Sequence, residues 1–502
     1  MNTCNTTVPN SHNTEDNSVK MSPLEQLQAL PIVAFKTHSQ KINQGDVFVC
    51  RQGLTWDSHR SAADAVKQGA IAVIANRQLD LNVPCIVTSS HASSINLINQ
   101  YFNYPQDRIK HIGVTGTNGK TTVSYCLQRL LNQDSDSAYT GTLGSFFGDD
   151  LYPLDNTTPD AITLLTLFNA MQKQKITSHV MEVSSHALSQ DRVSIIDFEA
   201  VLITNIGTDH LDYHKSREDY IQTKLRLIDR LKPNGAAVIN LDDALAPTMI
   251  ERCRSRANVI TFSLKNPNAD LYASHLKASC EGSEYTVTFK KQDYAVKTNL
   301  PFMFNIENTM AMLAMMVALD VPVESAVSRL TKLQPAPGRS EVYRLPNQAM
   351  AIIDYAHNYD SLLNLFNNVR NQSFGKVYTV LGVTGDRLSD AAAIGSLCSK
   401  HSEHVFFTTD NPLGFCQTSI FGELTSQVSG KNATVIEDRG LCIKAAVSYL
   451  KKGDVLLLCG KGDEKHQYVS GNKNEYVQYI GDYAALMLAT KQDVESAVEQ
   501  RL

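Results

Sequence analysis

The chain has 502 residues, of which 43% are hydrophobic and 19% charged, which is typical of a globular protein of about two to four domains. Its net charge of −5, without any run of Lys or Arg, argues against a nucleic-acid-binding protein. The ten cysteines are scattered without a Cys-x-x-Cys pair, as in reduced cytosolic proteins, and no apolar run approaches the roughly 20 residues of a membrane span.

The amino-terminal part of the chain divides into a polar tail and a small domain. Residues 1–20 are rich in Asn, Ser and Thr and lack the apolar segment of a signal peptide, so we interpret them as the disordered tail of a cytoplasmic protein. In 21–108, apolar strand-like runs at 46–50 and 71–74 flank a helical stretch around 62–68. We expect this block to be a separate, small α/β domain.

The middle of the chain, 109–336, alternates apolar strands with amphipathic helices. Such alternation is typical of a mostly parallel sheet, whose ligands lie at the carboxyl ends of the strands. We expect strands at 112–114, 179–183, 201–205 and 236–240, helices at 123–131, 161–173 and 220–231, and a further helical region at 309–332.

A segment with two prolines and a glycine, 334–339, indicates a linker to a third domain. Beyond it, apolar strands are expected at 351–354, 377–381, 404–408 and 455–458. The sequence therefore predicts an α/β protein of three domains. These are a small α/β domain at 21–108, a central domain with a mostly parallel sheet at 109–336, and a Rossmann-like domain at 337–502.

A glycine-rich loop stands between the first central strand and the helix that follows it. Its glycines let backbone N–H groups approach phosphate oxygens, Lys120 can reach the outer phosphates, and the Thr121 hydroxyl can bind Mg²⁺. The first glycine of the usual pattern falls one position off, and a loop that merely joins strand to helix is the alternative. We expect the loop to bind a nucleoside triphosphate through Gly116, Thr117, Asn118, Gly119, Lys120, Thr121 and Thr122.

Polar side chains also stand at the ends of two other expected strands. Glu182 lies where a carboxylate can hold a Mg²⁺ ion against phosphates, although a solvated glutamate is an equally good interpretation. His210 lies between two aspartates directly after a strand, and a ligand role and a structural role are again evenly balanced.

Lys224 carries no signal of its own. It lies on a helix whose start is marked by Ser216 as N-cap, with Asp219 three residues on. From the sequence alone, a lysine facing solvent is the commoner interpretation.

Taken together, these motifs resemble those of the Mur ligases in order and spacing, over nearly the whole chain after the tail. Glu182-Val183-Ser184-Ser185-His186, with Gln190 and Arg192, resembles the branch that extends UDP-N-acetylmuramoyl-L-alanyl-D-glutamate. The full set comprises 115–122, Asn156-Thr157-Thr158-Pro159, 181–188, Asp209-His210-Leu211-Asp212 with Lys224, Asn305 with Asn308, Gly338-Arg339, Asp354-Tyr355-Ala356-His357 and Gly460-Lys461-Gly462.

The resemblance implies an ATP-dependent amide-bond ligase of peptidoglycan precursor synthesis. ATP phosphorylates the γ-carboxylate of D-Glu in UDP-MurNAc-L-Ala-D-Glu, and the amine of a diamino acid then displaces phosphate. This chemistry needs positioning and charge neutralisation more than a protein nucleophile. The implied catalytic residues are Lys120, Glu182, His210 and Lys224, with two Mg²⁺ ions held by Thr121, Glu182, His210 and a carbamate that CO₂ forms on Lys224.

The resemblance also implies the substrate contacts. The nucleotide is assigned to Asn305, Asn308, Arg339 and Asp354, and Phe302 stands near them where relatives often have a glycine. The UDP-muramoyl-dipeptide is assigned to Ser39 of the UDP-binding first domain and to Asn156, Thr157, Thr158, Ser184, Gln190 and Arg192. The diamino acid is assigned to Arg387, Asp410, Asn411, Gly460 and Glu464.

The identity of the added amino acid depends on one motif. Diaminopimelate-adding relatives carry Asp-Asn-Pro-Arg, whose Arg pairs with the second carboxylate, whereas this chain has Asp410-Asn411-Pro412-Leu413. Leucine cannot donate to a carboxylate, so L-lysine is expected, with ornithine and diaminopimelate as alternatives.

Two other functions compete with this interpretation. A folylpolyglutamate synthetase would lack the muramoyl-type first domain, and an inactive scaffold homologue would not need Lys120, Glu182, His210 and Lys224. We expect a monomer that acts on small molecules and has neither a nucleic-acid nor a membrane partner.

Overall fold

The structure, a computed structural model, describes residues 21–53, 56–133, 135–210, 213–254, 257–372, 374–471 and 475–499. The tail predicted at 1–20 and two residues of one motif, Leu211 and Asp212, lie outside them. Internal contacts divide the chain into two compact units, Met1–Pro105 with Ile162–Asn169 and Gln106–Ala161 with Ala170–Leu502. The domain boundaries expected near 108 and 337 stay predictions.

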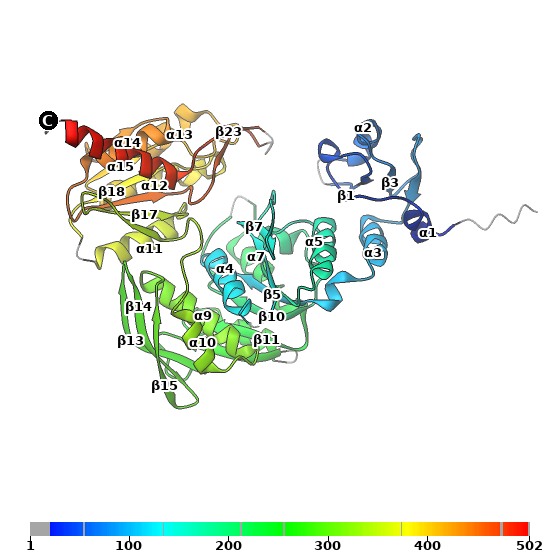
Figure 1. Cartoon of the computed structure of the whole chain (residues 1–502), viewed down its shortest axis with the longest axis horizontal. Coiled ribbons are helices and arrows are strands. Elements are labelled where there is room, and N and C mark those ends of the chain that lie inside the picture. Colours follow the sequence, from blue (N-terminus) through cyan, green and yellow to red (C-terminus); the bar gives the residue numbers. More distant parts are fainter. Residues whose placement is uncertain are drawn as a thin grey trace, which may run out of the picture. The chain divides into compact units, whose positions relative to one another are not determined.

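The first unit is built on a small parallel sheet (blue in Figure 1). Its elements are α1 (Pro23–Gln28), β1 (Phe35–Lys36), β2 (Val47–Val49), α2 (Ala62–Lys67), β3 (Ala72–Ala75), β4 (Cys85–Val87) and α3 (His91–Tyr101). The strands lie in the order β1-β2-β3-β4. Phe48 and Val73 of the sheet pack with Ile42 and Ala65 into a buried core.

An eleven-stranded sheet forms the centre of the second unit. Its strands are β5 (Lys110–Thr115), β6 (Ser137–Gly141), β7 (Gly144–Phe147), β8 (Asp150–Tyr152), β9 (Ser178–Glu182), β10 (Phe198–Ile203), β11 (Leu231–Asn240), β12 (Ala257–Ser263), β13 (Leu271–Ser279), β14 (Gly282–Phe289) and β15 (Gln292–Thr298). They lie in the order β15-β14-β13-β12-β11-β10-β5-β9-β6-β7-β8. The strands from β13 to β6 pair in parallel, and antiparallel hairpins extend the sheet at both edges.

Helices cover this central sheet. They are α4 (Lys120–Leu131), α6 (Ser185–Ser189), α7 (Arg217–Leu225), α8 (Ala246–Cys253), α9 (Met303–Ala318) and α10 (Val323–Leu330), while α5 (Ala161–Lys173) is divided between the two units. The helix α9 is apolar on nearly all sides, and its Met310, Met312 and Met315 are fully buried. A helix of this kind must be enclosed, and α9 packs against α4, α10 and the strands β11 to β13 (Figure 1).

The carboxyl-terminal part of the second unit has its own six-stranded sheet. Its elements are β16 (Glu341–Arg344), β17 (Met350–Asp354), α11 (Tyr359–Arg370), β18 (Val377–Leu381), α12 (Leu388–His401), β19 (His404–Phe407), α13 (Gln417–Ser426), β20 (Ala433–Val435), α14 (Arg439–Tyr449), β21 (Val455–Cys459), β22 (His466–Tyr468), β23 (Tyr476–Gln478) and α15 (Asp482–Glu499). The sheet order is β16-β17-β21-β18-β19-β20, parallel except for β16, while β22 and β23 form a separate ribbon.

Alternating residues of these strands build two cores. Ile352 packs with α11, α12 and α13 on one face of the sheet, whereas its neighbours Ala351 and Ile353 pack with α14 and α15 on the other. Because successive side chains of a strand point to opposite faces, a sheet that is apolar on both faces needs helices on both. The Rossmann-like expectation for this part is therefore confirmed.

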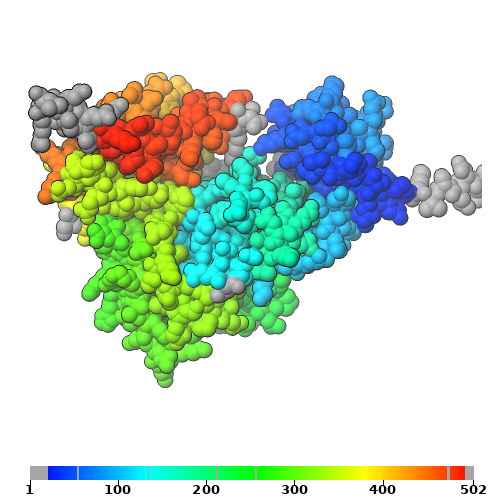
Figure 2. Space-filling view, viewed as in Figure 1, coloured from blue at the N-terminus to red at the C-terminus, as the bar shows by residue number. Residues whose placement is uncertain are grey.

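One side chain of the central domain is buried in the core of the carboxyl-terminal one. Phe302 precedes α9 with φ +72°, is 0% exposed, and belongs to the same hydrophobic cluster as Ile352 and Leu362. Beside it, Met303 N donates to Asn368 Oδ1 of α11 at 2.8 Å. In Figure 2 the yellow-to-red surface of the smaller sheet and its helices continues into the green surface of the central sheet.

Most of the expected strands and helices are confirmed to within a few residues, although the structure also contains strands that were not expected, among them β6 to β8 and β12. The helix expected at 220–231 ends at Leu225, and the helical region at 309–332 is two helices, α9 and α10. The antiparallel hairpins β13 to β15 were not expected. None of the helices in the described residues is both long and apolar enough to cross a membrane.

Candidate active site

The glycine-rich loop between β5 and α4 has the backbone geometry of an anion-binding turn. Gly116 has φ +153° and Gly119 has φ +84°, and a side chain at Gly116 would collide with Thr204. The Asn205 side-chain oxygen supports the loop by accepting from Asn118 N at 3.0 Å. The loop therefore stands preformed at the amino terminus of α4, where N–H groups and the helix dipole favour phosphate.

Two lysines lie against this loop, the half-buried Lys120 and the buried Lys224. Lys120 Nζ donates to the carbonyl oxygens of Gly116 and Thr117 at 2.9 and 3.0 Å, and Lys224 Nζ donates to that of Gly116 at 2.8 Å. Lys224 is only 2% exposed, so the solvent-facing interpretation is wrong. Burial, with the nearby charge of Lys120, holds the pKa of Lys224 well below its usual value, and burial also lowers the pKa of Lys120.

Glu182, at the end of β9, is fully buried beside the loop residue Thr121. Its carboxylate accepts from Thr121 Oγ1 at 2.9 Å, Tyr139 Oη at 2.5 Å and Thr142 N at 2.9 Å. Arg339 Nη2 donates to the same Thr121 hydroxyl at 3.1 Å. A carboxylate and a hydroxyl in contact beside a phosphate loop are the oxygen ligands that Mg²⁺ prefers, so these residues fit a magnesium site. The interpretation of Glu182 as a solvated glutamate is wrong.

Asp209 and His210 lie in the loop that follows β10, and Asp209 contacts Arg387 of the short 3-10 helix Gly385–Arg387, between β18 and α12. Asp209 Oδ1 accepts from Nη1 and Nη2 of Arg387, both at 3.1 Å, and His210 Nε2 lies 3.7 Å from Asp209 Oδ2. Burial opposes ionisation of Asp209, but the charges of Arg387 and His210 outweigh it and lower its pKa to about 2. Burial also lowers the pKa of His210.

A second metal site is not formed by these side chains alone. Among the residues that the structure describes, no three His, Cys, Asp or Glu side chains gather as a metal site would require. A Mg²⁺ ion at His210 therefore needs a further anionic ligand, which Lys224 as an unmodified amine does not supply.

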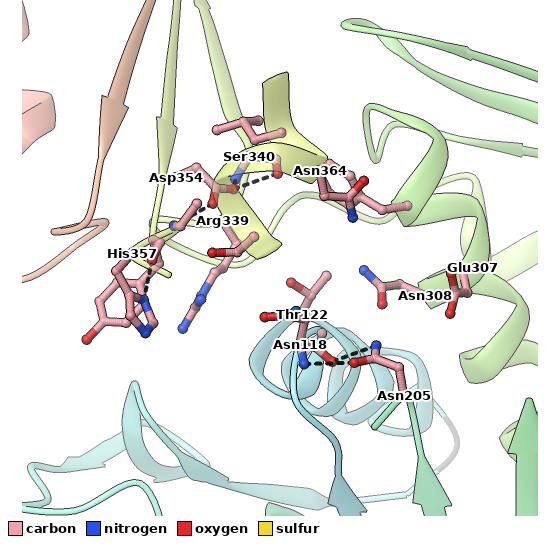
Figure 3. A pocket seen from close by; sticks show the side chains of 16 residues that line it. Asn118, Thr122, Asn205, Glu307, Asn308, Arg339, Ser340, Asp354, His357 and Asn364 are labelled. Atoms are coloured by element: carbon pink, nitrogen blue, oxygen red, sulfur yellow. Dashed lines mark hydrogen bonds between the residues drawn. The ribbon is translucent and has the colours of Figure 1, made fainter. Parts of the chain in front are cut away.

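A pocket beside the loop joins segments from the central sheet and the carboxyl-terminal sheet (Figure 3). The nucleotide-side residues Asn308, Arg339 and Asp354 all line it, and Asn305 Oδ1 accepts from Asn308 Nδ2 at 2.8 Å. The pocket is lined by Asn118, Gly119, Thr122, Asn205, Phe304, Glu307, Asn308, Arg339, Ser340, Asp354, Tyr355, Ala356, His357, Ser361, Asn364 and Leu365.

Two of these residues, Arg339 and Asp354, are held by the neighbours Tyr355 and Ser340, which were not predicted from the sequence. The Arg339 guanidinium lies 4.2 Å from the centre of the Tyr355 ring, and Asp354 Oδ2 accepts from Ser340 N and Oγ, both at 2.8 Å. Burial lowers the pKa of the nearby His357 to about 4. Tyr355 and His357 belong to the motif from which only Asp354 was chosen, so the signal for them was present.

Four residues assigned to the muramoyl-dipeptide lie together beside Glu182. Thr158 Oγ1 donates to the Glu182 carbonyl at 2.8 Å and accepts from Ser184 N at 3.0 Å. Arg192 Nη1 donates to the Thr158 carbonyl at 2.8 Å, while its Nη2 donates to Gln190 Oε1 at 2.8 Å. The residues predicted to bind the muramoyl-dipeptide therefore adjoin the predicted magnesium site.

The other residues of that set are less enclosed. Thr157 Oγ1 lies 3.2 Å from Thr142 Oγ1, and Asn156 is exposed. Ser39 belongs to the first unit, where it opens the short 3-10 helix Ser39–Lys41.

Three residues assigned to the diamino acid, Asp410, Asn411 and Glu464, surround a buried lysine that was not predicted, whereas Arg387 pairs with Asp209. Lys461 Nζ donates to Asn411 Oδ1 at 2.7 Å and to Glu464 Oε2 at 2.8 Å, and it lies 3.3 Å from Asp410 Oδ1. The preceding Gly460 has φ +99°. Lys461 is fully buried, and its signal was the Gly-Lys-Gly motif, in which only the first glycine was chosen.

Leu413 begins the loop that follows this cluster. It has φ +53°, and its backbone N donates to the Tyr468 carbonyl at 3.2 Å, while Gly414 N donates to the Val469 carbonyl at 2.7 Å. The loop is therefore tied to β22, and the Leu413 side chain is half-buried.

Comparison with known protein families assigns the two large sheets. Residues 114–316 match the Mur ligase middle domain, and residues 338–462 match the Mur ligase glutamate ligase domain. The chain is 33% identical over 447 residues to the UDP-N-acetylmuramoyl-L-alanyl-D-glutamate–2,6-diaminopimelate ligase of Bacillus cereus, covering 87% of this chain and 90% of that protein. The same ligase of Listeria innocua is 33% identical over 457 residues, with 89% and 92% covered.

Solved structures give the same result. A structure of a UDP-N-acetylmuramoyl-L-alanyl-D-glutamate–2,6-diaminopimelate ligase superposes with a TM-score of 0.62 and 29% identity, over 92% of this chain and 95% of that one. MurF ligase from Thermotoga maritima in complex with ADP has a TM-score of 0.66 at 18% identity, over 92% and 98%, and shows a shared fold.

Proposed function

This chain belongs to the Mur ligase family, and from that premise we propose that it is an ATP-dependent ligase which joins a diamino acid to UDP-MurNAc-L-Ala-D-Glu. One observation carries the proposal most directly. A preformed phosphate loop, a buried Thr121–Glu182 pair and four of the residues assigned to the dipeptide adjoin one another within the second unit. These four residues are Thr158, Ser184, Gln190 and Arg192. The proposal includes a cytoplasmic monomer acting on small molecules, as expected from the sequence.

The reaction has two steps, and neither step needs a nucleophile from the protein. An oxygen of the D-Glu γ-carboxylate attacks the γ-phosphorus of ATP, the bond to ADP breaks, and an acyl phosphate forms. The unprotonated amine of the diamino acid then attacks the acyl carbon, loses a proton, and displaces phosphate. We assign Lys120 and the loop N–H groups to holding the phosphates, and Thr158, Ser184 and Arg192 to orienting the acceptor.

Two groups that the structure does not hold complete this site in the proposal. Mg²⁺ ions, when bound by Thr121, Glu182 and His210, would neutralise phosphate charge. CO₂ reacts with a neutral amine and turns it into an anion, and burial of Lys224 with its lowered pKa favours that neutral amine. We therefore propose that Lys224 is carbamylated and supplies the anionic ligand that the His210 site needs.

For the amino acid, we propose L-lysine. The named relatives are diaminopimelate ligases, and at 33% identity they leave the side-chain specificity of this chain open. Leu413 supports lysine, because its side chain cannot donate to a second carboxylate next to the Asp410–Asn411–Lys461–Glu464 cluster.

The decisive experiment measures ADP release with UDP-MurNAc-L-Ala-D-Glu and, in parallel, L-lysine, L-ornithine or meso-diaminopimelate. We expect release to require both the acceptor and an amino acid, with the highest kcat/KM for L-lysine. A higher kcat/KM for diaminopimelate would overturn the amino-acid assignment alone. ADP release that is indifferent to the muramoyl acceptor would overturn the ligase proposal.

A further inference from the structure

The nucleotide pocket has two chemically different sides. Figure 3 shows Glu307 and Asn308 of α9 opposite Arg339 and His357, with the loop residue Asn118 between them. The Arg339 side adjoins the proposed magnesium site, because Arg339 donates to the Thr121 hydroxyl. A nucleotide with its phosphates in the loop would therefore place its base toward the α9 side.

The α9 side offers flat apolar contacts together with polar edges. Phe304, Glu307 and Asn308 are spaced three and four residues apart, so they share one face of the helix, and all three line the pocket. Leu365 of α11 lines the same pocket. A purine needs such a combination, because its faces are apolar while its edge carries hydrogen-bonding groups.

One oxygen of the Glu307 carboxyl is held by a hydrogen bond. Glu307 Oε1 accepts a hydrogen bond from Asn240 Nδ2 at 2.7 Å. Burial, with the nearby charges of Asp242 and Asp243, raises its pKa to about 7 against the opposing effects of Lys265 and Asn240. One carboxyl oxygen is thus anchored, while the residue itself lines the pocket.

We propose that Glu307 selects adenine, by accepting a hydrogen bond from the 6-amino group through the carboxyl oxygen that Asn240 does not hold. The inference rests on the proposed function, because it needs a nucleoside triphosphate in this pocket. A 6-oxo purine presents an acceptor at the same position, and two acceptors facing each other in a partly dry site repel. Glu307 is then a specificity residue for the nucleotide and takes no part in the chemical steps.

The test compares three nucleotides at about pH 8.5, where a carboxyl with the pKa of Glu307 is ionised. The nucleotides are ATP, ITP with a 6-oxo group, and purine riboside triphosphate with hydrogen at position 6. For the wild-type protein we expect kcat/KM for ATP to exceed that for either analogue by about 10- to 100-fold, which is the value of one buried hydrogen bond. The equilibrium affinities for ADP and IDP should show the same preference.

The informative variant is Glu307→Gln. Its side-chain oxygen can keep the bond from Asn240, which turns an N–H donor toward the base, so the ATP-to-ITP ratio should fall to within about threefold or invert. Glu324→Gln, an exposed glutamate on α10, is the matched control and should leave the ratio unchanged.

The outcomes separate this inference from the proposed function. Equal losses for all three nucleotides in Glu307→Gln would assign Glu307 a purely structural role and overturn the inference. In another outcome, the wild-type protein binds ADP more tightly than IDP but releases no ADP in response to the muramoyl acceptor. That outcome would overturn the ligase proposal while supporting the role of Glu307.

Discussion

Replacing Lys224 tests whether its amine is structural or catalytic. Lys224→Met removes the amine but keeps an unbranched side chain of similar length, so the buried space stays filled. The lost contact is the 2.8 Å bond to the Gly116 carbonyl, and that carbonyl still accepts from Lys120 Nζ at 2.9 Å. Because no acceptor is left without a donor, we expect the free energy of unfolding to change by only about 1 kcal/mol.

The effect on activity should be far larger. If a carbamate on Lys224 supplies the anionic ligand beside the γ-phosphate, Lys224→Met should lower kcat at least about 1000-fold. In Lys224→Ala, short-chain carboxylates can enter the vacated space with the same charge and should restore part of the rate. The assay is acceptor-dependent ADP release, with urea unfolding of each variant in parallel.

Direct observation of the modification completes this test. Wild-type protein equilibrated with ¹³C-labelled CO₂ should give a carbamate carbon signal that Lys224→Met lacks. Lys215→Met, at an exposed lysine before α7, is the matched control and should keep both signal and activity. Full activity of Lys224→Met, or of wild-type enzyme freed of CO₂, would refute the reasoning.

Three further predictions follow from the site and the core. Lys120→Ala should retain less than a few per cent of the ligation rate, since the outer phosphates lose their nearest fixed cation, and substantial residual turnover would contradict this role. Leu413→Arg should raise kcat/KM for meso-diaminopimelate relative to L-lysine by about 10- to 100-fold, because the added guanidinium can pair with the second carboxylate. The control Leu441→Arg, at an exposed leucine, should leave this ratio unchanged. If Leu413→Arg also leaves the ratio unchanged, the basis for choosing lysine is removed. Burial lowers the pKa of His111 to about 3 from an ordinary value of 6.5, so the unfolded state binds the proton first as pH falls below 6.5. The free energy of unfolding should therefore drop by about 2 kcal/mol between pH 6.5 and pH 5, and a flat profile in urea titrations would count against this account.

The phosphate loop and the strand ends could be predicted because their signals are local. A strand, a glycine turn and a helix start are adjacent in the chain, and the carboxyl ends of parallel strands meet at one edge of the sheet. That is why Thr121 and Glu182, sixty-one residues apart, could both be placed beside a nucleotide. What could not be predicted was that Tyr139 and Thr142 hold the Glu182 carboxylate, because β6 reaches β9 only through the sheet order.

Two charged residues removed from the surface, Glu307 and Lys461, were missed for a different reason. Glu307 stands in a helix whose other residues are largely apolar, where a single acid looks like a solvent-facing position. Lys461 is fully buried among acidic and amide partners, and no spacing rule in the sequence brings Asp410 and Asn411, about fifty residues earlier in the chain, to it. The hairpins from β13 to β15 were missed because the domains were predicted from alternating strands and helices. That alternation indicates a parallel sheet and gives no sign of antiparallel strands added at its edge.

The ring of Phe302 bears on whether the two halves of the second unit could exist apart. A fragment ending at 336 would present this ring to water, and the complementary fragment would contain a void where it belongs, each at a cost of roughly 2–3 kcal/mol. Motifs and linkers in a sequence indicate domain boundaries, whereas a shared hydrophobic core determines which parts of the protein unfold together. Both ligase domains belong to one compact unit, so we expect them to unfold together even though the proline-containing segment before Arg339 separates them in the sequence.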